Sequence, residues 1–243
     1  MESSTQTAAS IDRETAHSNA VREMFSGIAG KYDLLNHLLS LNIDKGWRRQ
    51  VRTEIADILA RENAAVLDVA CGTGDLSLEL KRGSRAKVTG TDFCRPMLAI
   101  AQEKSGDSLP YVEADAMNLP FDDRVFEAVT IAFGLRNLPN VERGLGELFR
   151  IIKPGGKLVV LEFSSPVVPG FRQLFNLYFS QVLPRIGGIV SGSRAAYTYL
   201  PDSVSKFPDQ KKLADLFKRT GFADVKFKNL TGGIAAIHTG EKP

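Results

Sequence analysis

The chain has 243 residues, 43% of them apolar and 24% charged, which predicts one soluble globular domain with a large core. Its formal net charge of +3 is too small to indicate a nucleic-acid partner, and no apolar run approaches the length of a membrane span. The two cysteines, Cys71 and Cys94, indicate neither a disulfide framework nor a zinc site and are compatible with a reducing cytoplasm.

The first fifty residues contain no strand of the predicted sheet. Residues 1–20 are rich in Ser, Thr, Ala and charge without an apolar core, which predicts a flexible tail rather than a signal peptide. Residues 21–50 have a helical pattern interrupted by glycines, and because they precede the first strand they are free to cover the sheet as a lid. Tyr32 and Trp47 belong to this lid or pack as core aromatics. A charged amphipathic helix is expected over 48–62.

The stretch VLDVACGTGDLSLEL, residues 66–80, predicts a buried parallel strand followed by a glycine turn and a helix. Gly72 and Gly74 let a ligand approach bare backbone, where amides at the helix start can donate to it. Asp92 closes the next strand, over 87–93, where an acid is placed to accept from the two hydroxyls of a ribose. Together these features predict a cofactor that contains a ribose.

The glycine turn departs from a dinucleotide site. Ser77 stands where the dinucleotide fingerprint has its third glycine. Asp68, inside the first strand, would repel a pyrophosphate but suits a ligand that carries an ammonium or a sulfonium. S-adenosylmethionine has a ribose, an amino-acid end and a sulfonium, so we expect it as the cofactor. The alternative is that Asp68 is a buried acid that only ties down a loop.

Strands and helices alternate from here to residue 163, which predicts a doubly wound, Rossmann-like parallel sheet. Asp115 and Ala116 follow the third strand, at the same edge of the sheet as Asp92. The expected elements are a helix over 96–104, a strand over 110–113, an acidic turn and strand over 121–133, a helix over 140–152, a KPGG turn at 153–156 and a strand over 157–163.

Residues 164–207 interrupt that alternation as an insertion. Within them, apolar residues between 171 and 182 follow a helical stripe, which leaves open core packing, a wall of an apolar substrate pocket, or contact with a membrane surface. A helix over 208–219 ends at Gly221. Two final strands form a hairpin, which puts one antiparallel strand into the sheet and predicts a class I S-adenosylmethionine-dependent methyltransferase fold.

Four blocks of sequence carry a more specific resemblance that runs from about Arg22 to Lys242. They are KYDLLNHLLSLNIDKGWRR (31–49), IAFGLRNLP (131–139), the KPGG turn and LEFSSP (161–166). With these blocks the chain resembles the ubiquinone/menaquinone biosynthesis C-methyltransferase family. The resemblance implies methylation of a ring carbon of a polyprenylated benzoquinol or naphthoquinol by S-adenosylmethionine. It leaves open peripheral contact with the inner face of the membrane and a homodimer.

The chemistry of a quinol substrate indicates a catalytic group, and the family indicates cofactor contacts. The catalytic group is Arg136, to stabilise the quinolate, Asn137, to orient the same oxygen, and Tyr32, to relay a proton from the lid. An alternative for Arg136 is a salt bridge to an acid of the lid, and His37 and Glu162 are both candidates for the proton acceptor. The cofactor contacts carried over from the family fall on Thr73, Asp92, Asp115 and Ala116. No metal is required by this chemistry, and no motif offers one.

Several alternatives stay open from sequence. Asp44-Lys45 favours the naphthoquinol, demethylmenaquinol, over the benzoquinol of ubiquinone biosynthesis. A cofactor-binding scaffold without catalysis would show a damaged glycine turn or lack Arg136, and neither is seen. Methyltransferases that act on amino groups of nucleic-acid bases carry an Asn/Asp-Pro-Pro-aromatic run after the fourth strand, where this chain has FGLRN over 133–137.

Overall fold

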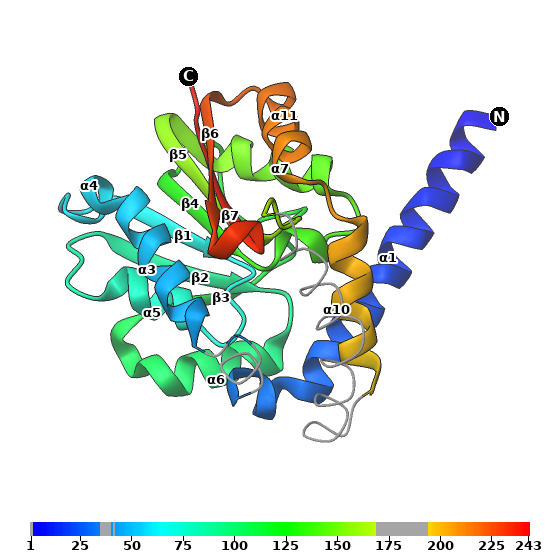
Figure 1. Ribbon diagram of the computed structural model, residues 1–243, viewed down its shortest axis with the longest axis horizontal. Coiled ribbons are helices and arrows are strands. Elements are labelled where there is room, and N and C mark those ends of the chain that lie inside the picture. The colour runs from blue at the N-terminus through cyan, green and yellow to red at the C-terminus, as the bar shows by residue number, and fades with distance from the viewer. Residues whose placement is uncertain (1, 35–39, 41, 169–193) are drawn as a thin grey trace.

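A computed structural model describes residues 2–34, 40, 42–168 and 194–243. Its centre is a seven-stranded sheet in the order β3-β2-β1-β4-β5-β7-β6, with helices on both faces (Figure 1). The strands are β1 (Ala65–Val69), β2 (Lys87–Asp92), β3 (Tyr111–Glu113), β4 (Phe126–Ala132), β5 (Ile152–Phe163), β6 (Ala223–Leu230) and β7 (Ala235–Glu241).

Among the seven described strands, β7 alone runs in the direction opposite to the other six. The pairs β3–β2, β2–β1, β1–β4 and β4–β5 are parallel, whereas β7 pairs antiparallel with both β5 and β6. This arrangement confirms the expected class I methyltransferase sheet, mostly parallel with one antiparallel strand.

The central strand β1 is buried because helices cover both of its faces. Val66 packs with Trp47, Val51 and other residues of the helices that precede and follow it, while Leu67 and Val69 pack with helices on the other face. The helices are α1 (Glu2–Ile28), α3 (Ile43–Glu54), α4 (Ala56–Leu59), α5 (Asp75–Lys81), α6 (Arg95–Ser105), α7 (Val141–Ile151), α10 (Arg194–Lys206) and α11 (Gln210–Thr220). Short 3₁₀ turns are η1 (Ala29–Lys31), η2 (Gly106–Ser108), η3 (Leu135–Asn137) and η5 (Thr231–Gly233).

The ends of two helices follow the expected capping chemistry. The Asp209 side chain accepts from the backbone N–H of Lys212 at 2.9 Å at the start of α11, and Gly221 ends that helix with φ of 112°. Asn140 caps α7 in the same way, accepting from Arg143 N at 3.0 Å. Both helices pack on the face of the sheet that contains Leu67.

The N-terminal segment differs from the expected loose tail, because residues 2–28 form the helix α1. Its N-terminal half extends away from the sheet, and its C-terminal half crosses toward the ends of the strands (Figure 1). Contacts of its side chains with the next layer hold it there. Glu14 accepts from Asn140 Nδ2 and from Arg143 Nη1, each at 3.2 Å, and Val21 is buried.

Two further boundaries differ from expectation. The amphipathic helix expected over 48–62 begins earlier, at Ile43, and breaks at Ile55 into α3 and α4. The KPGG stretch, expected as a turn at 153–156, does not form a separate turn after the helix. It belongs to β5, where the register to β4 shifts between Phe126 and Ala128 and Gly155 has φ of 75°, so that this stretch is accommodated as an irregularity of the ladder.

Candidate active site

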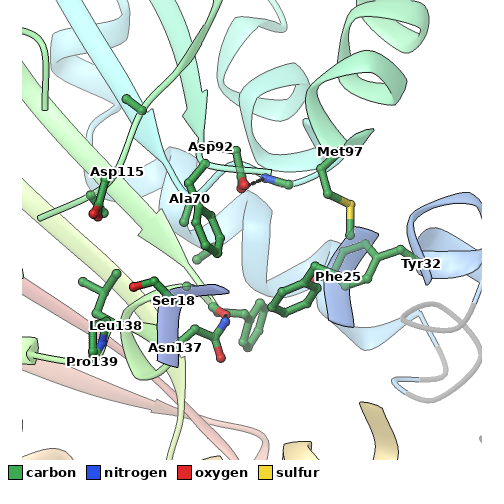
Figure 2. Close-up of a pocket in the computed structure, with 17 residues that line it drawn as sticks. Ser18, Phe25, Tyr32, Ala70, Asp92, Met97, Asp115, Asn137, Leu138 and Pro139 are labelled. Carbon is green, nitrogen blue, oxygen red and sulfur yellow. Dashed lines mark hydrogen bonds between the residues drawn. The ribbon is translucent and has the colours of Figure 1, made fainter. Parts of the chain in front are cut away.

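A cavity opens at the carboxyl ends of β1, β2 and β4, beneath the C-terminal half of α1. Figure 2 shows Asp92 and Asp115 on its sheet side and Ser18 and Phe25 of α1 facing them. Parallel α/β sheets bind ligands at this edge. The lining residues are Ser18, Phe25, Tyr32, Ala70, Gly72, Asp92, Phe93, Met97, Ala114, Asp115, Ala116, Ala132, Phe133, Gly134, Asn137, Leu138 and Pro139.

Two residues at this edge of the sheet have a left-handed backbone conformation. Ala70 and Phe133, the residues that follow β1 and β4, have φ of 50° and 57°, although neither is a glycine. Such conformations are costly for residues with a side chain and concentrate at functional sites. Both residues line the cavity, so the two strand ends are bent sharply around the space in which a ligand would lie.

Asp92 fixes the glycine turn and faces the cavity. Its Oδ2 accepts from the backbone N–H of Gly72 at 2.8 Å, as Figure 2 shows, and its Oδ1 accepts from the backbone N–H of Cys94 at 2.9 Å. Burial raises the pKa of Asp92 to about 6, although these amide donors act in the opposite direction. The carboxylate therefore holds its charge at neutral pH by a modest margin.

Of the cofactor residues expected from sequence, four line the cavity: Gly72, Asp92, Asp115 and Ala116. Asp115 Oδ1 accepts from the backbone N–H of Met117 at 2.9 Å, which fixes its side chain where β3 ends. Gly72 has φ of 57°, and a Cβ there would come within 3.8 Å of the Tyr32 ring, so the turn leaves its backbone close to the cavity.

Asp68 does not line the cavity, which differs from its expected contact with an ammonium or sulfonium. It is 1% exposed, and its two oxygens accept from Ser77 Oγ at 2.6 Å and Thr130 Oγ1 at 2.9 Å. Burial raises its pKa to about 7 despite these hydroxyl donors. Its observed contacts are those of the alternative, a buried acid that ties the first strand to the helix α5 and to β4.

Thr73 and Gly74 also lie outside the lining of the cavity. Thr73 Oγ1 donates to Asp33 Oδ1, in the segment that follows η1. Gly74 has φ of 82°, and a Cβ there would lie 2.7 Å from the Tyr111 hydroxyl oxygen, so the position requires glycine for packing. These two residues shape the turn and hold the lid.

Charged groups tie the lid to the glycine turn. Lys104 of α6 donates to Asp33 Oδ2 at 2.8 Å and also bonds Asp75, the first residue of α5. Arg48 of α3 lies 2.7 Å from Asp44 and 3.1 Å from Asp75. The cluster bridges the lid, the turn and α6, so the lid residues around it are fixed relative to the cofactor turn.

Arg136 lies in η3 and forms a buried ion pair. Its Nη1 donates to Glu162 Oε1 at 2.9 Å and its backbone N–H donates to Glu162 Oε2 at 3.2 Å, with the two side chains 7% and 2% exposed. Its guanidinium carbon lies 5.3 Å from the centroid of the Phe163 ring. Burial raises the pKa of Glu162 and the Arg136 charge opposes that rise. The acid that pairs with Arg136 therefore comes from the end of β5, whereas the sequence alternative placed it in the lid.

Asn137 is held by groups that the sequence did not indicate. Its Nδ2 donates to Phe133 O at 3.2 Å, and its Oδ1 accepts from the hydroxyl of Tyr199, in α10, at 3.1 Å. His17 of α1 places its Nε2 3.2 Å from the Asn137 carbonyl, which can only accept, so this nitrogen carries the proton. Apolar residues at 21, 24, 25 and 28 have helical spacing and were the available signal for α1.

Tyr32 lies at the cofactor side of the cavity, beside Phe25 and Met97 (Figure 2). Its ring meets that of Phe25 edge-on, with centroids 5.9 Å apart. Trp47 packs in the core and donates to Thr231 Oγ1 at 3.0 Å, as the core-aromatic interpretation expected. His37 and the apolar stripe over 171–182 lie outside the described residues.

Comparison with known proteins identifies the family. Residues 13–242 match the model of the ubiE/COQ5 methyltransferase family. The chain belongs to that family. It is 48% identical over 227 residues to the demethylmenaquinone methyltransferase of Deinococcus radiodurans, covering 92% of each chain. It is 50% identical over 226 residues to that of Thermus thermophilus, covering 90% of this chain and 100% of the relative. A Geobacter sulfurreducens relative, 44% identical over 238 residues, is named ubiquinone/menaquinone biosynthesis C-methyltransferase UbiE and covers 95% of this chain and 91% of the relative.

Solved structures place the ubiE/COQ5 chain in the methyltransferase fold. A Haemonchus contortus phosphoethanolamine N-methyltransferase 2 in complex with S-adenosyl-L-methionine is similar at a TM-score of 0.57 and 16% identity, covering 79% of this chain and 52% of that one. The [4+2]-cyclase SpnF is similar at a TM-score of 0.60 and 18% identity, covering 80% of both chains. A cyclase and an N-methyltransferase share this fold, so the fold does not set the reaction.

The site residues fit S-adenosylmethionine, which is the cofactor of this methyltransferase. The Asp92 carboxylate can accept from ribose hydroxyls, Gly72 leaves backbone accessible, and Asp115 can accept from the amino group of an adenine. The cavity has a volume of about 60 Å³, below the roughly 300–1,000 Å³ of ligand pockets, and Ser18, Phe25 and Tyr32 lie on its outer side.

The described residues contain neither a metal-binding cluster nor a membrane-spanning helix. Among them, no three side chains of His, Cys, Asp or Glu are grouped to hold a metal ion. In the same part of the chain, no helix combines the length and apolar character needed to cross a bilayer.

Proposed function

We propose that this enzyme transfers the methyl group of S-adenosylmethionine to a ring carbon of demethylmenaquinol, a polyprenylated naphthoquinol, to give menaquinol. The main support for this substrate is the match, along nearly all of the chain, to relatives named demethylmenaquinone methyltransferase, at 48% and 50% identity. The buried Arg136 at the edge of the cofactor cavity supports the same chemistry, because a quinol that loses its proton needs a fixed cation nearby.

The protein's task in this reaction is to stabilise charge on the quinol oxygen. As that oxygen loses its proton, electron density moves to the neighbouring ring carbon, which forms the new bond to the methyl group. S-adenosylmethionine supplies an electrophilic methyl whose bond to sulfur breaks as the new bond forms. The ring carbon then loses its own proton, which restores the aromatic ring, and the oxygen regains one, so each turnover releases a single proton to solvent.

Arg136 and Asn137 are the residues we assign to that oxygen. The guanidinium stays protonated at neutral pH, so Arg136 acts as a cation and not as a base. Glu162 accepts from Arg136 and from the backbone N–H of Phe163 at 2.8 Å, so in this proposal it orients the guanidinium and does not take the proton. Tyr32 closes the cofactor side, where a relay of the proton through its hydroxyl stays a prediction.

Contact with lipid follows from the substrate. A polyprenyl tail partitions into a bilayer, so the enzyme meets its substrate at the membrane surface. Leu34, Ile43, Val167 and Val168 are exposed apolar residues with exposed fractions of 61%, 42%, 56% and 46%, which supports peripheral contact with the inner face of the membrane. A homodimer stays a prediction from the resemblance.

The experiment offers the purified protein S-adenosylmethionine with reduced demethylmenaquinol, or with the reduced benzoquinol precursor of the same prenyl length, and identifies products by mass spectrometry. We expect methylation of the naphthoquinol and slower methylation of the benzoquinol. The oxidised quinones should not react, because they have no hydroxyl proton to lose. Faster methylation of the benzoquinol would favour the ubiquinone step, which the Geobacter relative's name includes. Cofactor binding without methylation of either quinol would favour a scaffold.

A further inference from the structure

A second cavity lies beside the cofactor cavity, between α1, η3 and α10. Its volume is about 650 Å³, within the range of ligand pockets. Figure 1 shows α10 running alongside α1, on the side of the molecule where the carboxyl ends of the parallel strands lie. Leu138 and Pro139 line both cavities, so the two spaces adjoin at the segment that follows η3.

Half of the residues that line this second cavity are polar and half are apolar. Arg13 and Glu14 of α1 and Asp202 and Lys206 of α10 are among the charged ones, and Lys206 pairs with Asp202 at 2.7 Å. The apolar lining residues include Ala20, Val21, Met24, Leu138 and Phe207. A lining that offers both apolar surface and polar groups suits a ring with polar substituents.

Two polar groups line this cavity, the buried side chain of Arg136 and the half-buried Tyr199. Arg136 is 7% exposed and lines it, and its Nε has no hydrogen-bond partner among the described residues. Tyr199 lines it as well and donates its hydroxyl to Asn137 Oδ1. A buried donor without a partner is costly unless a ligand or water supplies an acceptor.

We propose that the cavity between α1, η3 and α10 receives the ring of the quinol acceptor, with a ring oxygen at Arg136 and the hydroxyl of Tyr199 as a second contact. This inference rests on the proposed function and adds the place of the acceptor and a residue, Tyr199, that binds it. The apolar stripe of α1 at Ala20 and Met24 then forms one wall of the acceptor site.

Tyr199 is suited to both of its partners. In the structure its hydroxyl holds the Asn137 side chain, and a hydroxyl has lone pairs left with which to accept. A ring oxygen that enters beside Arg136 would come within reach of the same hydroxyl, so Tyr199 links the position of Asn137 to the presence of the acceptor. Burial raises the pKa of Tyr199, so its hydroxyl stays protonated and able to donate.

The test fills the cavity and leaves the cofactor side untouched. In Ala20→Trp an indole enters the space between α1 and α10, and we expect the KM for demethylmenaquinol to rise about tenfold or more. Calorimetry should give an unchanged affinity for S-adenosylmethionine, and thermal melting should be unchanged. Asn19→Trp is the matched control, since Asn19 is exposed on α1 and lines neither cavity, and it should behave as the wild type.

A conservative variant decides the proposal if Ala20→Trp does not fold. Tyr199→Phe keeps the ring and removes one hydroxyl, and we expect turnover to fall or the quinol KM to rise by about tenfold with cofactor affinity retained. Suppose that the wild type methylates demethylmenaquinol and that Ala20→Trp and Tyr199→Phe match it in KM and turnover. This result would overturn the proposed place of the acceptor but not the proposed function. A wild type that does not methylate any quinol would overturn the proposed function instead.

Discussion

Asp92 and Asp68 are two buried carboxyl groups near the same turn, and their surroundings give them different tasks. Asp92 faces the cavity and is held by two backbone amides, so it keeps acceptor capacity for ribose hydroxyls. Asp68 is enclosed by two hydroxyl groups and lines neither of the two cavities described above. Sequence alone placed both on the cofactor, because spacing along the chain does not reveal whether Ser77 and Thr130 already use the oxygens of Asp68.

The raised pKa of Asp92 predicts how cofactor affinity depends on pH. The ionised carboxylate accepts from the ribose, and each such charge-assisted hydrogen bond contributes about 1.5–3 kcal/mol. Because the pKa of Asp92 in the free protein is about 6, protonation below that pH removes the acceptor. Affinity for S-adenosylmethionine should be constant above about pH 7 and fall roughly tenfold per unit of pH well below 6.

Calorimetry between pH 5 and pH 8 measures this dependence. Asp92→Asn is the matched variant, with weaker binding at pH 8 and a flatter profile. If the wild-type affinity at pH 5 equals that at pH 8, the Asp92 carboxylate does not accept from the ribose hydroxyls.

Arg136→Lys tests the charge on the quinol oxygen. An ammonium cannot reproduce the planar fork of donors that spans Glu162 and the acceptor, so turnover should fall about 10²–10³-fold. Affinity for S-adenosylmethionine should stay near the wild-type value, because Arg136 does not line the cofactor cavity. Arg219→Lys, an exposed change in α11, is the control and should retain full turnover. A variant that melts early yet turns over normally when folded would make Arg136 a structural residue.

The η3 turn carries Arg136 and Asn137, and its position is set by Gly134. A Cβ on Gly134 would lie 2.6 Å from the Cβ of Ala70 and 3.2 Å from Ile131 Cγ1, so the turn can approach the end of β1 only with glycine there. Gly134→Ala should therefore displace η3, destabilise the protein by about 1–3 kcal/mol and lower turnover.

A second substitution makes this prediction specific. Ala70 has φ of 50°, where glycine is favourable, so Ala70→Gly removes the clashing Cβ without backbone cost. The double variant should recover most of the stability and turnover lost by Gly134→Ala, as judged by chemical unfolding and steady-state kinetics. Gly146→Ala in α7 is the control, because nothing lies within 4 Å of a Cβ there. Failure of Ala70→Gly to restore either property would show that this contact does not set η3.

At the scale of elements, sequence predicted most of the sheet and little of what covers it. Short apolar segments that alternate with helical ones, and a final hairpin, indicated the strands. A strand that is buried on both faces consists mostly of apolar residues, so it can be recognised from the sequence. The part of α1 before residue 21 was missed because most of its residues are polar or small and its contacts, through Glu14 and His17, are made with η3 and the start of α7. Tyr199 was missed because a tyrosine inside an insertion has no local signal that it reaches Asn137.

Over the whole molecule, α1 couples the two cavities. Ser18 and Phe25 cover the cofactor cavity, while Ala20 and Met24 wall the acceptor cavity. Because α1 forms a wall of both cavities, a quinol bound against it would hold α1 over the cofactor cavity. We therefore expect the cofactor to bind first and the quinol second.

Product inhibition tests this order. S-adenosylhomocysteine should compete with S-adenosylmethionine and act as a noncompetitive inhibitor against the quinol. Competition between menaquinol and demethylmenaquinol, with S-adenosylhomocysteine noncompetitive against both substrates, would indicate the reverse order and a different role for α1.

In the proposed reaction a bond forms between the cofactor's methyl and a ring carbon of the quinol. The position of the new methyl can be measured with S-adenosylmethionine labelled with ¹³C at the methyl, by letting the enzyme act on demethylmenaquinol and recording the carbon spectrum of the purified product. We expect a single labelled resonance of a methyl bound to an aromatic ring carbon. A labelled methoxy resonance, or no labelled quinol from a folded protein that binds the cofactor, would rule out methylation at the ring carbon.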